Sequence, residues 1–319
     1  MNNEHSSTAA SPLQAYSAAI AAIVDQIGAS TVAVLGRRHA VASGVVWRKG
    51  LVVTAAHVFR RTPVAVTLVG AGGKSLAATL VGIDSSTDLA LFRLADENVL
   101  APVVPGDASH VQAGHLAIAV GRSGEGDTLA SHGIVNRAGG PWQTWLGGHV
   151  DRLIRLDGGV YDGLSGAPVA DASGAVIGVA TAALSRSYGV VVPASTVERV
   201  VVALLANGHV ARAWLGIGAQ PVPLPNPTQK SPEKSTEKTA DKTGLLVTSL
   251  AAGGPAERAG VLVGDIIVSA GGEAAGNLRE LRHVLSVHIG KTVTLAVLRG
   301  GVPVEVHTEV GEWPAERRC

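Results

Sequence analysis

The length, the composition and the spacing of apolar residues together predict a mainly β fold of about two domains. The chain has 319 residues, which corresponds to about two domains at roughly 150 residues each. Hydrophobic residues make up 46% and charged residues 16%, so the chain can bury a sizeable core and differs from disordered and coiled-coil proteins. Aromatic residues make up only 3% while glycines number 40, a composition typical of short valine-rich strands joined by tight turns.

Short apolar runs separated by turn residues extend from residue 32 to about residue 192 and favour an antiparallel barrel or sandwich. The runs are residues 31–35, 44–47, 51–55, 64–69, 89–94, 116–120, 175–180 and 189–192. Before them, residues 13–27 place apolar side chains at helical spacing, which predicts an amphipathic helix that packs on the domain. Residues 1–12 are expected to form a disordered N-terminus.

A polar tract separates two apolar regions of the chain. Residues 194–206 repeat apolar residues at helical intervals and stop at Asn207-Gly208, a common helix end. Residues 221–243 are rich in Pro, Lys, Glu, Ser and Thr. They cannot bury apolar area and are expected to be mobile, with a short solvated helix as the alternative. Residues 244–310 then return to strand-like runs around one helical stretch, residues 278–288.

The composition excludes several classes of partner and cofactor. Lys and Arg number 26 against 25 Asp and Glu, and the net charge of +1 gives no electrostatic reason to bind nucleic acid or an anionic membrane. The apolar runs have about ten residues, whereas a membrane span needs about 20. The single cysteine, Cys319, excludes an intramolecular disulfide and a cysteine-based zinc site. No two histidines are spaced i,i+4 on a predicted helix, so neither a metal nor a cofactor is expected.

A histidine, an aspartate and a serine occur in an order that favours nucleophilic catalysis. His57 ends a strand-like run, Asp88 directly precedes another, and Ser165 lies in the turn Asp-Gly-Leu-Ser-Gly. Each residue alone is more often structural than functional. Together, in this order on antiparallel strands, they resemble the triad of the chymotrypsin-like serine proteases. An α/β-hydrolase is disfavoured, because its acid and histidine follow the serine and its strands alternate with helices.

More closely, the chain resembles the HtrA (Deg) family of serine proteases from about residue 13 to residue 311. The matching blocks are residues 43–46, 54–57, 87–91, 119–121, 131–135, 163–168, 174–179 and 214–217, and residues 254–260 with 264–268 are similar to the signature of a PDZ domain. The resemblance implies a chymotrypsin-like double β-barrel protease domain over residues 13–210, a C-terminal PDZ domain over residues 211–311 and a tail of residues 312–319. The polar tract at 221–243 then becomes an insert within the PDZ domain.

The resemblance also implies a mechanism. His57 would take the proton of Ser165 as the serine attacks a peptide carbonyl, and Asp88 would hold the imidazole in the required tautomer. The backbone N–H groups of Gly163 and Ser165 would form the oxyanion hole.

Substrate contacts are implied in both domains. The wall of the S1 pocket would come from Val160, Ala180 and Thr181, which favours a small aliphatic side chain, although Asp157 and Asp162 leave an acidic pocket as the alternative. A PDZ domain binds a C-terminal peptide as an added strand. The residues expected to contact that peptide are Trp214, Leu215, Gly216 and Ile217, with packing between the domains as the alternative role of Trp214 and Leu215.

The expected protein is a cofactor-free serine endopeptidase that cleaves unfolded or misfolded polypeptides and also binds C-terminal peptides. Two departures from the family pattern, Leu164 for Asn and Ala167 for Gly, keep an inactive or weakly active, chaperone-like peptide-binding protein as the alternative. A methyl group at Ala167 would cause strain if that position needs a positive φ.

Assembly and location follow from the N-terminal residues. HtrA relatives commonly form trimers through N-terminal aromatic residues, but Tyr16 is the only aromatic residue before Trp47, so a homotrimer is a weak expectation. The first eleven residues contain Glu4 and no Lys or Arg, unlike the start of a signal peptide. A cytoplasmic location is expected, with the periplasm of the relatives as the alternative.

Overall fold

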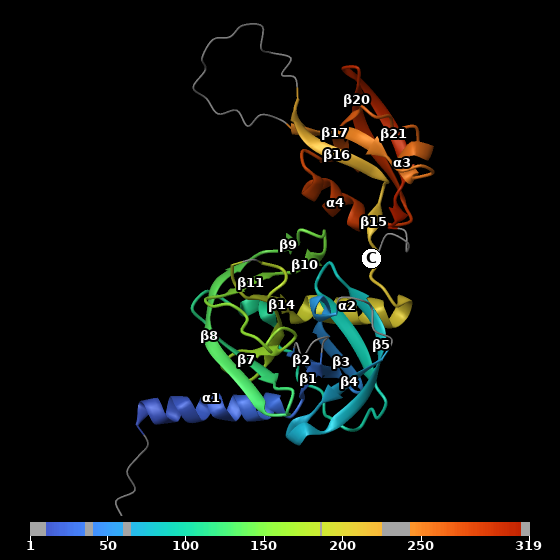
Figure 1. The fold of residues 1–319 in the computed structure, drawn as a ribbon. Helices are drawn as coiled ribbons and strands as arrows, with labels where there is room; N and C mark the ends of the chain where they lie inside the picture. Colours follow the sequence, from blue (N-terminus) through green and yellow to red (C-terminus); the bar gives the residue numbers. More distant parts are fainter. Residues whose placement is uncertain (1–10, 36–40, 60–64, 186, 225–242, 314–319) are drawn as a thin grey trace, which may run out of the picture. The chain divides into compact units, whose positions relative to one another are not determined.

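A computed structural model describes residues 11–35, 41–59, 65–185, 187–224 and 243–313 of the chain. The chain divides into two compact units, Met1–Val210 and Ala211–Cys319. The first unit contains two closed barrels, and the second contains an open sheet and a small two-stranded sheet, so the predicted mainly β fold is confirmed (Figure 1).

The first barrel is closed by six antiparallel strands in the order β1-β2-β3-β6-β5-β4. The strands are β1 (Thr31–Leu35), β2 (Val41–Arg48), β3 (Leu51–Ala55), β4 (Ala65–Val69), β5 (Ser75–Asp84) and β6 (Leu89–Leu94). Its interior is filled mainly by Val, Leu and Ala side chains, together with the fully buried Phe92. Closure leaves no exposed sheet edge, which is how a chain of short strands avoids pairing with other chains.

The second barrel repeats this architecture in the order β11-β14-β13-β12-β7-β8. The strands are β7 (Leu116–Arg122), β8 (Thr128–Gly139), β11 (Leu153–Leu156), β12 (Pro168–Ala170), β13 (Val176–Thr181) and β14 (Val190–Pro193). A small hairpin of β9 (Trp142–Gln143) and β10 (His149–Val150) leaves this barrel between β8 and β11. Two six-stranded barrels in one unit are the double-barrel arrangement that the sequence predicts.

Helix α2 (Ala194–Asn207) follows the second barrel and buries one face in the core. It ends at Gly208, which adopts φ +72° and donates its N–H to the Leu204 carbonyl at 2.8 Å. This left-handed end satisfies a helix carbonyl and needs glycine. In the described part of this unit, the short helical turns are η2 (Ala56–Val58), η3 (Ala71–Gly73) and η4 (Ala108–His110).

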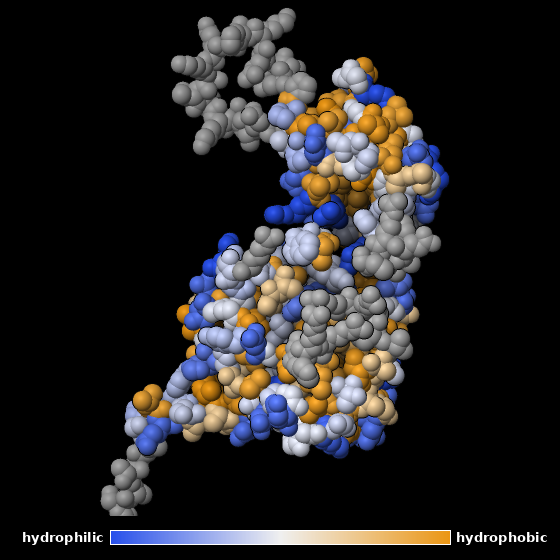
Figure 2. Space-filling model, viewed as in Figure 1, coloured by the Kyte–Doolittle hydropathy of each residue, from blue (hydrophilic) through white to orange (hydrophobic). Residues whose placement is uncertain are grey.

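Helix α1 (Pro12–Gly28) forms as predicted but packs along only part of its length. Ser11 and Gln14 form a reciprocal capping box at its start. Its last turns pack on the barrels, and nearer its start the Tyr16 ring lies edge-on to His132 of β8 with 6.2 Å between ring centroids; Leu13 and Tyr16 are nevertheless 76% and 41% exposed. At about 1.5 Å per residue the helix is about 25 Å long, so its first turns extend beyond the barrel surface (Figures 1 and 2). The expectation of a helix packed on the domain over residues 13–27 is therefore met only in part, because the first half contacts the domain through Tyr16 and is otherwise exposed.

The second unit is a five-strand sheet with a sixth short strand, in the order β16-β17-β18-β20-β21 with β19 beside β18. Its elements are β15 (Ala213–Trp214), β16 (Ile217–Pro223), β17 (Thr243–Leu250), α3 (Pro255–Arg258), β18 (Ile266–Ala270), β19 (Glu273–Ala274), α4 (Leu278–Ser286), β20 (Thr292–Arg299), β21 (Val302–Glu309) and β22 (Gly311–Glu312). Asn277 caps α4 by accepting from two backbone N–H groups. The β16 strand is an edge of the sheet.

The polar tract lies between two strands that pair with each other. Strands β16 and β17 are antiparallel, and Pro223 pairs with Thr243 at their ends. The chain from residue 224 to residue 242 therefore connects two strands of one sheet. Three expectations concern segments that lie largely outside the described residues. They are the mobility of residues 221–243, the disorder of residues 1–12 and the tail of residues 312–319.

Candidate active site

His57 and Asp88 meet because the strands that precede and follow them are paired. Strand β3 ends at Ala55, which pairs with Leu89 at the start of β6. His57 lies in the turn after β3, so its side chain reaches the carboxylate of Asp88. His57 Nδ1 lies 2.7 Å from Asp88 Oδ2, and the His57 backbone N–H donates to Asp88 Oδ1 at 2.8 Å. The hydrogen bond to Asp88 raises the pKa of His57 above its ordinary value of 6.5, against the lowering effect of burial.

Asp88 is held in an unusual backbone conformation. It is 3% exposed and has φ +60°, and among the described residues it is the one non-glycine with a positive φ. Such conformations cost free energy and occur often at functional sites. The side-chain hydroxyl of Thr181 donates to Asp88 Oδ2. Thr181 therefore supports the aspartate and does not line the pocket in which the sequence places it.

The turn before Asp88 is rigid and is contacted by the β9–β10 hairpin. Asp84 accepts from the Ser86 N–H and hydroxyl at 3.0 and 2.6 Å, and from the Thr87 hydroxyl at 2.7 Å. In turn, the Thr144 hydroxyl donates to the Ser86 carbonyl at 2.7 Å from within the hairpin. The loop that presents the exposed Trp145 is thereby joined to the segment that positions Asp88.

Ser165 lies in a turn whose two positive φ values fall on glycines. The Leu164 N–H donates to the Tyr161 carbonyl at 3.0 Å and Gly163 has φ +86°, which fits a type II turn. Gly166 has φ +85°, and a Cβ atom there would lie 2.1 Å from the Ser43 carbonyl oxygen.

The two departures from the family pattern fit this turn. Ala167 lies outside the positive-φ positions and is fully buried, so its methyl group belongs to the core and causes no backbone strain. The Leu164 side chain is likewise buried, at 4% exposure.

The serine turn packs against the strand that leads to His57. A Cβ atom on Gly166 would contact Thr54 and Ala55 of β3, and the Gly166 N–H donates to Ala180 on β13 at 2.8 Å. Within the described residues no hydrogen bond joins Ser165 Oγ to His57; such catalytic bonds often tighten only when substrate is bound.

The two N–H groups expected to form the oxyanion hole belong to this turn. Among the hydrogen bonds of the described residues, none uses the N–H of Gly163 or of Ser165.

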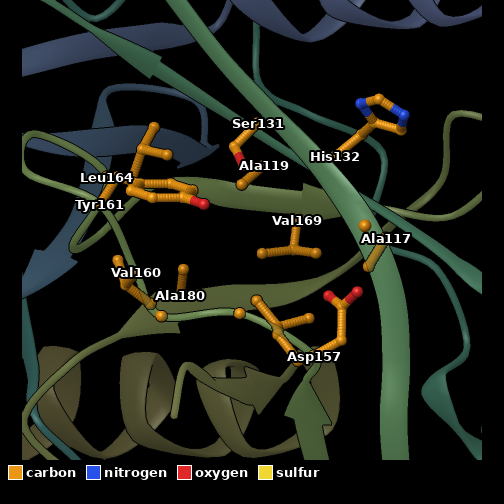
Figure 3. Close-up of a pocket in the computed structure, with 14 residues that line it drawn as sticks. Ala117, Ala119, Ser131, His132, Asp157, Val160, Tyr161, Leu164, Val169 and Ala180 are labelled. Carbon is orange, nitrogen blue, oxygen red and sulfur yellow. The ribbon is translucent and has the colours of Figure 1, made fainter.

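A pocket of about 170 Å³ opens beside the serine turn. Val160 and Ala180 line it, and most of its other lining residues are small or apolar (Figure 3). Asp157 also lines the pocket, and its Oδ1 accepts the Ile134 N–H at 3.3 Å. Asp162, the other candidate for an acidic pocket, is not among the lining residues.

The predicted peptide-binding residues of the second unit take different roles. Leu215 is 3% exposed, so its side chain belongs to the core, and its carbonyl accepts the Ala256 N–H at 2.9 Å. Gly216 has φ +76°, which turns the chain into β16. Trp214 stacks edge-on against Trp313 with 6.5 Å between ring centroids. Ile217 begins the free edge of β16.

In the part of the chain that the structure describes, no group of three or more His, Cys, Asp or Glu side chains could hold a metal ion. Over the same residues, no helix has the length and apolar character required to cross a membrane.

Comparisons with known proteins identify both units. Residues 42–179 match the trypsin-like peptidase domain family, and residues 216–310 match the PDZ domain family. The chain thus combines a trypsin-like peptidase domain with a PDZ domain, as the resemblance in the sequence implies.

Curated relatives are DegP-like proteins. A probable periplasmic serine endoprotease DegP-like of Bartonella henselae is 35% identical over 275 residues, which is 84% of this chain and 52% of the relative. The corresponding protein of Rhizobium meliloti is 34% identical over 261 residues, or 80% of this chain and 50% of the relative. The chain spans about half the length of the curated relatives it matches.

Solved structures share the fold over nearly the whole chain. The HtrA-type protease AlgW with a decapeptide gives a TM-score of 0.72 at 23% identity, over 92% of this chain and 99% of that one. The serine endoprotease from Yersinia pestis gives a TM-score of 0.72 at 24% identity, over 92% and 98%. The chain is a relative of the DegP-like serine endoproteases and has the HtrA architecture, so the resemblance predicted from the sequence motifs is confirmed.

Proposed function

We propose that this chain is a serine endopeptidase that cleaves unfolded polypeptides, with Ser165 as nucleophile, His57 as general base and Asp88 as its partner. The hydrogen-bonded pair of His57 and Asp88 beside the serine turn is the observation that carries the proposal. Asp88 accepts from Nδ1–H, which leaves Nε2 unprotonated and able to take the hydroxyl proton of Ser165. The serine then forms an acyl enzyme, His57 protonates the leaving amine, and water releases the acid by the reverse path.

The N–H groups of Gly163 and Ser165 are proposed to bind the oxyanion. Both belong to one turn, and both are unused by hydrogen bonds of the described residues. Donors fixed before reaction stabilise the charge that develops on the substrate oxygen, and each is worth about 3 kcal/mol at the transition state.

The proposed S1 pocket is the one lined by Val160 and Ala180. Most of its lining is small or apolar, with Asp157, His132 and Tyr161 as the exceptions, and this lining favours a short aliphatic side chain on the residue before the cleaved bond. Thr181 is reassigned from the pocket wall to the support of Asp88.

The second unit is proposed to bind the C-terminus of a polypeptide. Strand β16 is an edge strand that can accept an added strand, and α4 packs against the same sheet. The backbone N–H groups of the turn from Trp214 to Ile217 would hold the terminal carboxylate, while the buried Leu215 side chain keeps that turn fixed.

Assembly and location are proposed on different grounds. The exposed Leu13 and Tyr16 of α1 supply an apolar surface that favours self-association, and light scattering tests the homotrimer. Because the DegP-like relatives are named periplasmic, we place this chain in the periplasm and not in the cytoplasm expected from the sequence. Cell fractionation with markers for both compartments tests this placement.

The variant Ser165→Ala tests the activity. The wild-type protein should degrade casein and react with a fluorophosphonate probe, whereas S165A should do neither. If the wild-type protein binds unfolded casein but neither cleaves it nor reacts with the fluorophosphonate probe, the result favours the chaperone-like alternative and contradicts the proposal.

A further inference from the structure

Ser43 lies where the first barrel contacts the serine turn, and all of its polar atoms are engaged. It is on β2 and is fully buried. Its N–H donates to the Ser165 carbonyl at 2.9 Å and its hydroxyl donates to the Gly163 carbonyl at 2.6 Å. Its Oγ also accepts the Arg122 N–H at 3.0 Å, and its carbonyl accepts the Thr54 hydroxyl at 2.7 Å. A single side chain therefore joins both barrels to the turn.

The Ser43 hydroxyl fixes one end of a peptide group that is also fixed at its other end. The carbonyl of the Gly163–Leu164 peptide accepts from Ser43, and the N–H of the same peptide donates to the Tyr161 carbonyl at 3.0 Å. Because a peptide group is planar, two bonds on opposite ends determine its orientation.

The Ser43 N–H fixes a second peptide group in the same way. The carbonyl of the Ser165–Gly166 peptide accepts from Ser43, and its N–H donates to the Ala180 carbonyl at 2.8 Å. The peptide between these two fixed groups carries the N–H of Ser165. Its own carbonyl, that of Leu164, accepts the Ala167 N–H at 3.1 Å, so its orientation is limited by that bond and by the fixed groups on both sides, while the Ser165 N–H is unused among the described residues.

Close packing shows that the Ser43 hydroxyl has room for no larger neighbour. A Cβ atom on Gly121 would lie 2.6 Å from Ser43 Oγ, so a glycine is needed there. Leu164 has an apolar, buried side chain and cannot hold the turn by a hydrogen bond of its own. Among the described residues, the side-chain hydrogen bond to the backbone of residues 163–166 comes from Ser43, in addition to the backbone bonds of the turn.

We propose that Ser43 is a positioning residue, whose hydroxyl holds the turn in the form that presents the N–H groups of Gly163 and Ser165 to the substrate oxygen. This inference rests on the proposed endopeptidase activity. The hydroxyl touches neither the substrate nor the reacting atoms and acts through the Gly163 carbonyl.

The variant Ser43→Ala should lower kcat by about tenfold or more and leave KM within about twofold. Removing an oxyanion donor outright lowers kcat by about 10²–10³-fold, and a donor that is only misaligned should lose part of that factor. The loss falls on kcat because the N–H groups bind most strongly to the charged oxygen of the transition state. A peptide boronate, which forms a tetrahedral adduct with the serine, should bind more weakly by the same factor as kcat falls. The acid limb of the pH profile should not move, since the His57–Asp88 pair is untouched.

Two further variants separate positioning from general loss of stability. Ser43→Cys keeps a side-chain donor, but the thiol is larger and donates weakly, so its kcat should also fall; it is the second variant to measure if S43A does not fold. Thr31→Val removes another buried hydroxyl of the first barrel, which donates to the Ile27 carbonyl at 3.0 Å, and should keep kcat.

The outcomes also distinguish this inference from the proposed activity. A wild-type protein without turnover contradicts the proposed activity itself. An active wild-type protein whose folded S43A or S43C variant keeps kcat within twofold overturns the role of Ser43. A loss of kcat in T31V equal to that in S43A also overturns it, because the effect would then reflect barrel stability.

Discussion

The substitution Asp88→Asn tests the chemistry of the site with almost no change of shape. Asp88 accepts three hydrogen bonds, from the His57 N–H, the His57 Nδ1–H and the Thr181 hydroxyl. An asparagine amide has one accepting oxygen, so its NH2 group must face at least one of these donors. Asparagine tolerates a positive φ, so the backbone at +60° is not further strained.

The lowest-cost response to this amide is a change of tautomer. With the NH2 group toward the imidazole, Nδ1 gives up its proton to become the acceptor, and Nε2 becomes protonated. Nε2 of His57 can then no longer take the proton of Ser165. By analogy with the same substitution in a serine-protease triad, kcat should fall by about 10⁴, which corresponds to about 5.4 kcal/mol in the barrier.

The assay is the steady-state cleavage of a quenched fluorescent peptide, with the melting temperature measured on the same samples. Asp107→Asn is the matched control, because Asp107 also accepts hydrogen bonds, from Ser109, in an exposed turn. D107N should keep its rate. A folded D88N variant within tenfold of the wild-type kcat would refute the role assigned to Asp88.

Three further predictions concern pH and side-chain contacts. The hydrogen bond to Asp88 holds the pKa of His57 above 6.5, so kcat/KM should rise with pH through a midpoint above that value; a midpoint below it would contradict the pairing. Thr144→Val loses the bond to Ser86 and should lower kcat/KM by up to about tenfold, whereas T144S should keep it. The hydrogen bonds from Arg299 hold the pKa of Asp265 in the folded protein below its ordinary value of 3.8. The pair therefore stabilises the PDZ unit fully above pH 3.8. This stabilisation is lost as the pH falls from 3.8 through the pKa of Asp265 in the folded protein. The free energy of unfolding, measured with urea, should fall less over that acid range in the Arg299→Met variant than in the wild-type protein.

The double barrel was predictable because its signal is local and repeated. Short valine-rich runs between glycines indicate each strand. A motif such as the one around His57 then indicates which fold the strands form. The partial docking of α1 was not predictable in this way. Apolar spacing at Leu13 and Tyr16 indicates a face that can be buried, but whether a surface lies within reach depends on where the helix leaves the barrel.

The supporting residues of the site depend on contacts between distant segments. Thr181 appears from the sequence to be a pocket residue because it lies in the strand next to the pocket, yet its hydroxyl turns to Asp88 from 93 positions away. Ser43 belongs to a recognisable motif, but nothing local shows that it reaches Gly163. Likewise, the positive φ falls on Gly166 and not on Ala167, a one-residue difference that only the backbone geometry reveals.

The pairing of β16 with β17 has a consequence for how this chain can be altered. The strands meet at Pro223 and Thr243, so their register does not depend on the length of the segment that joins them. The entropy of closing a flexible loop grows only logarithmically, and each doubling of its length costs about 0.6 kcal/mol. A reporter peptide or an epitope can therefore be introduced between these strands at little cost to folding, and deletions there should be tolerated equally well. The hairpin is a natural place to label the protein.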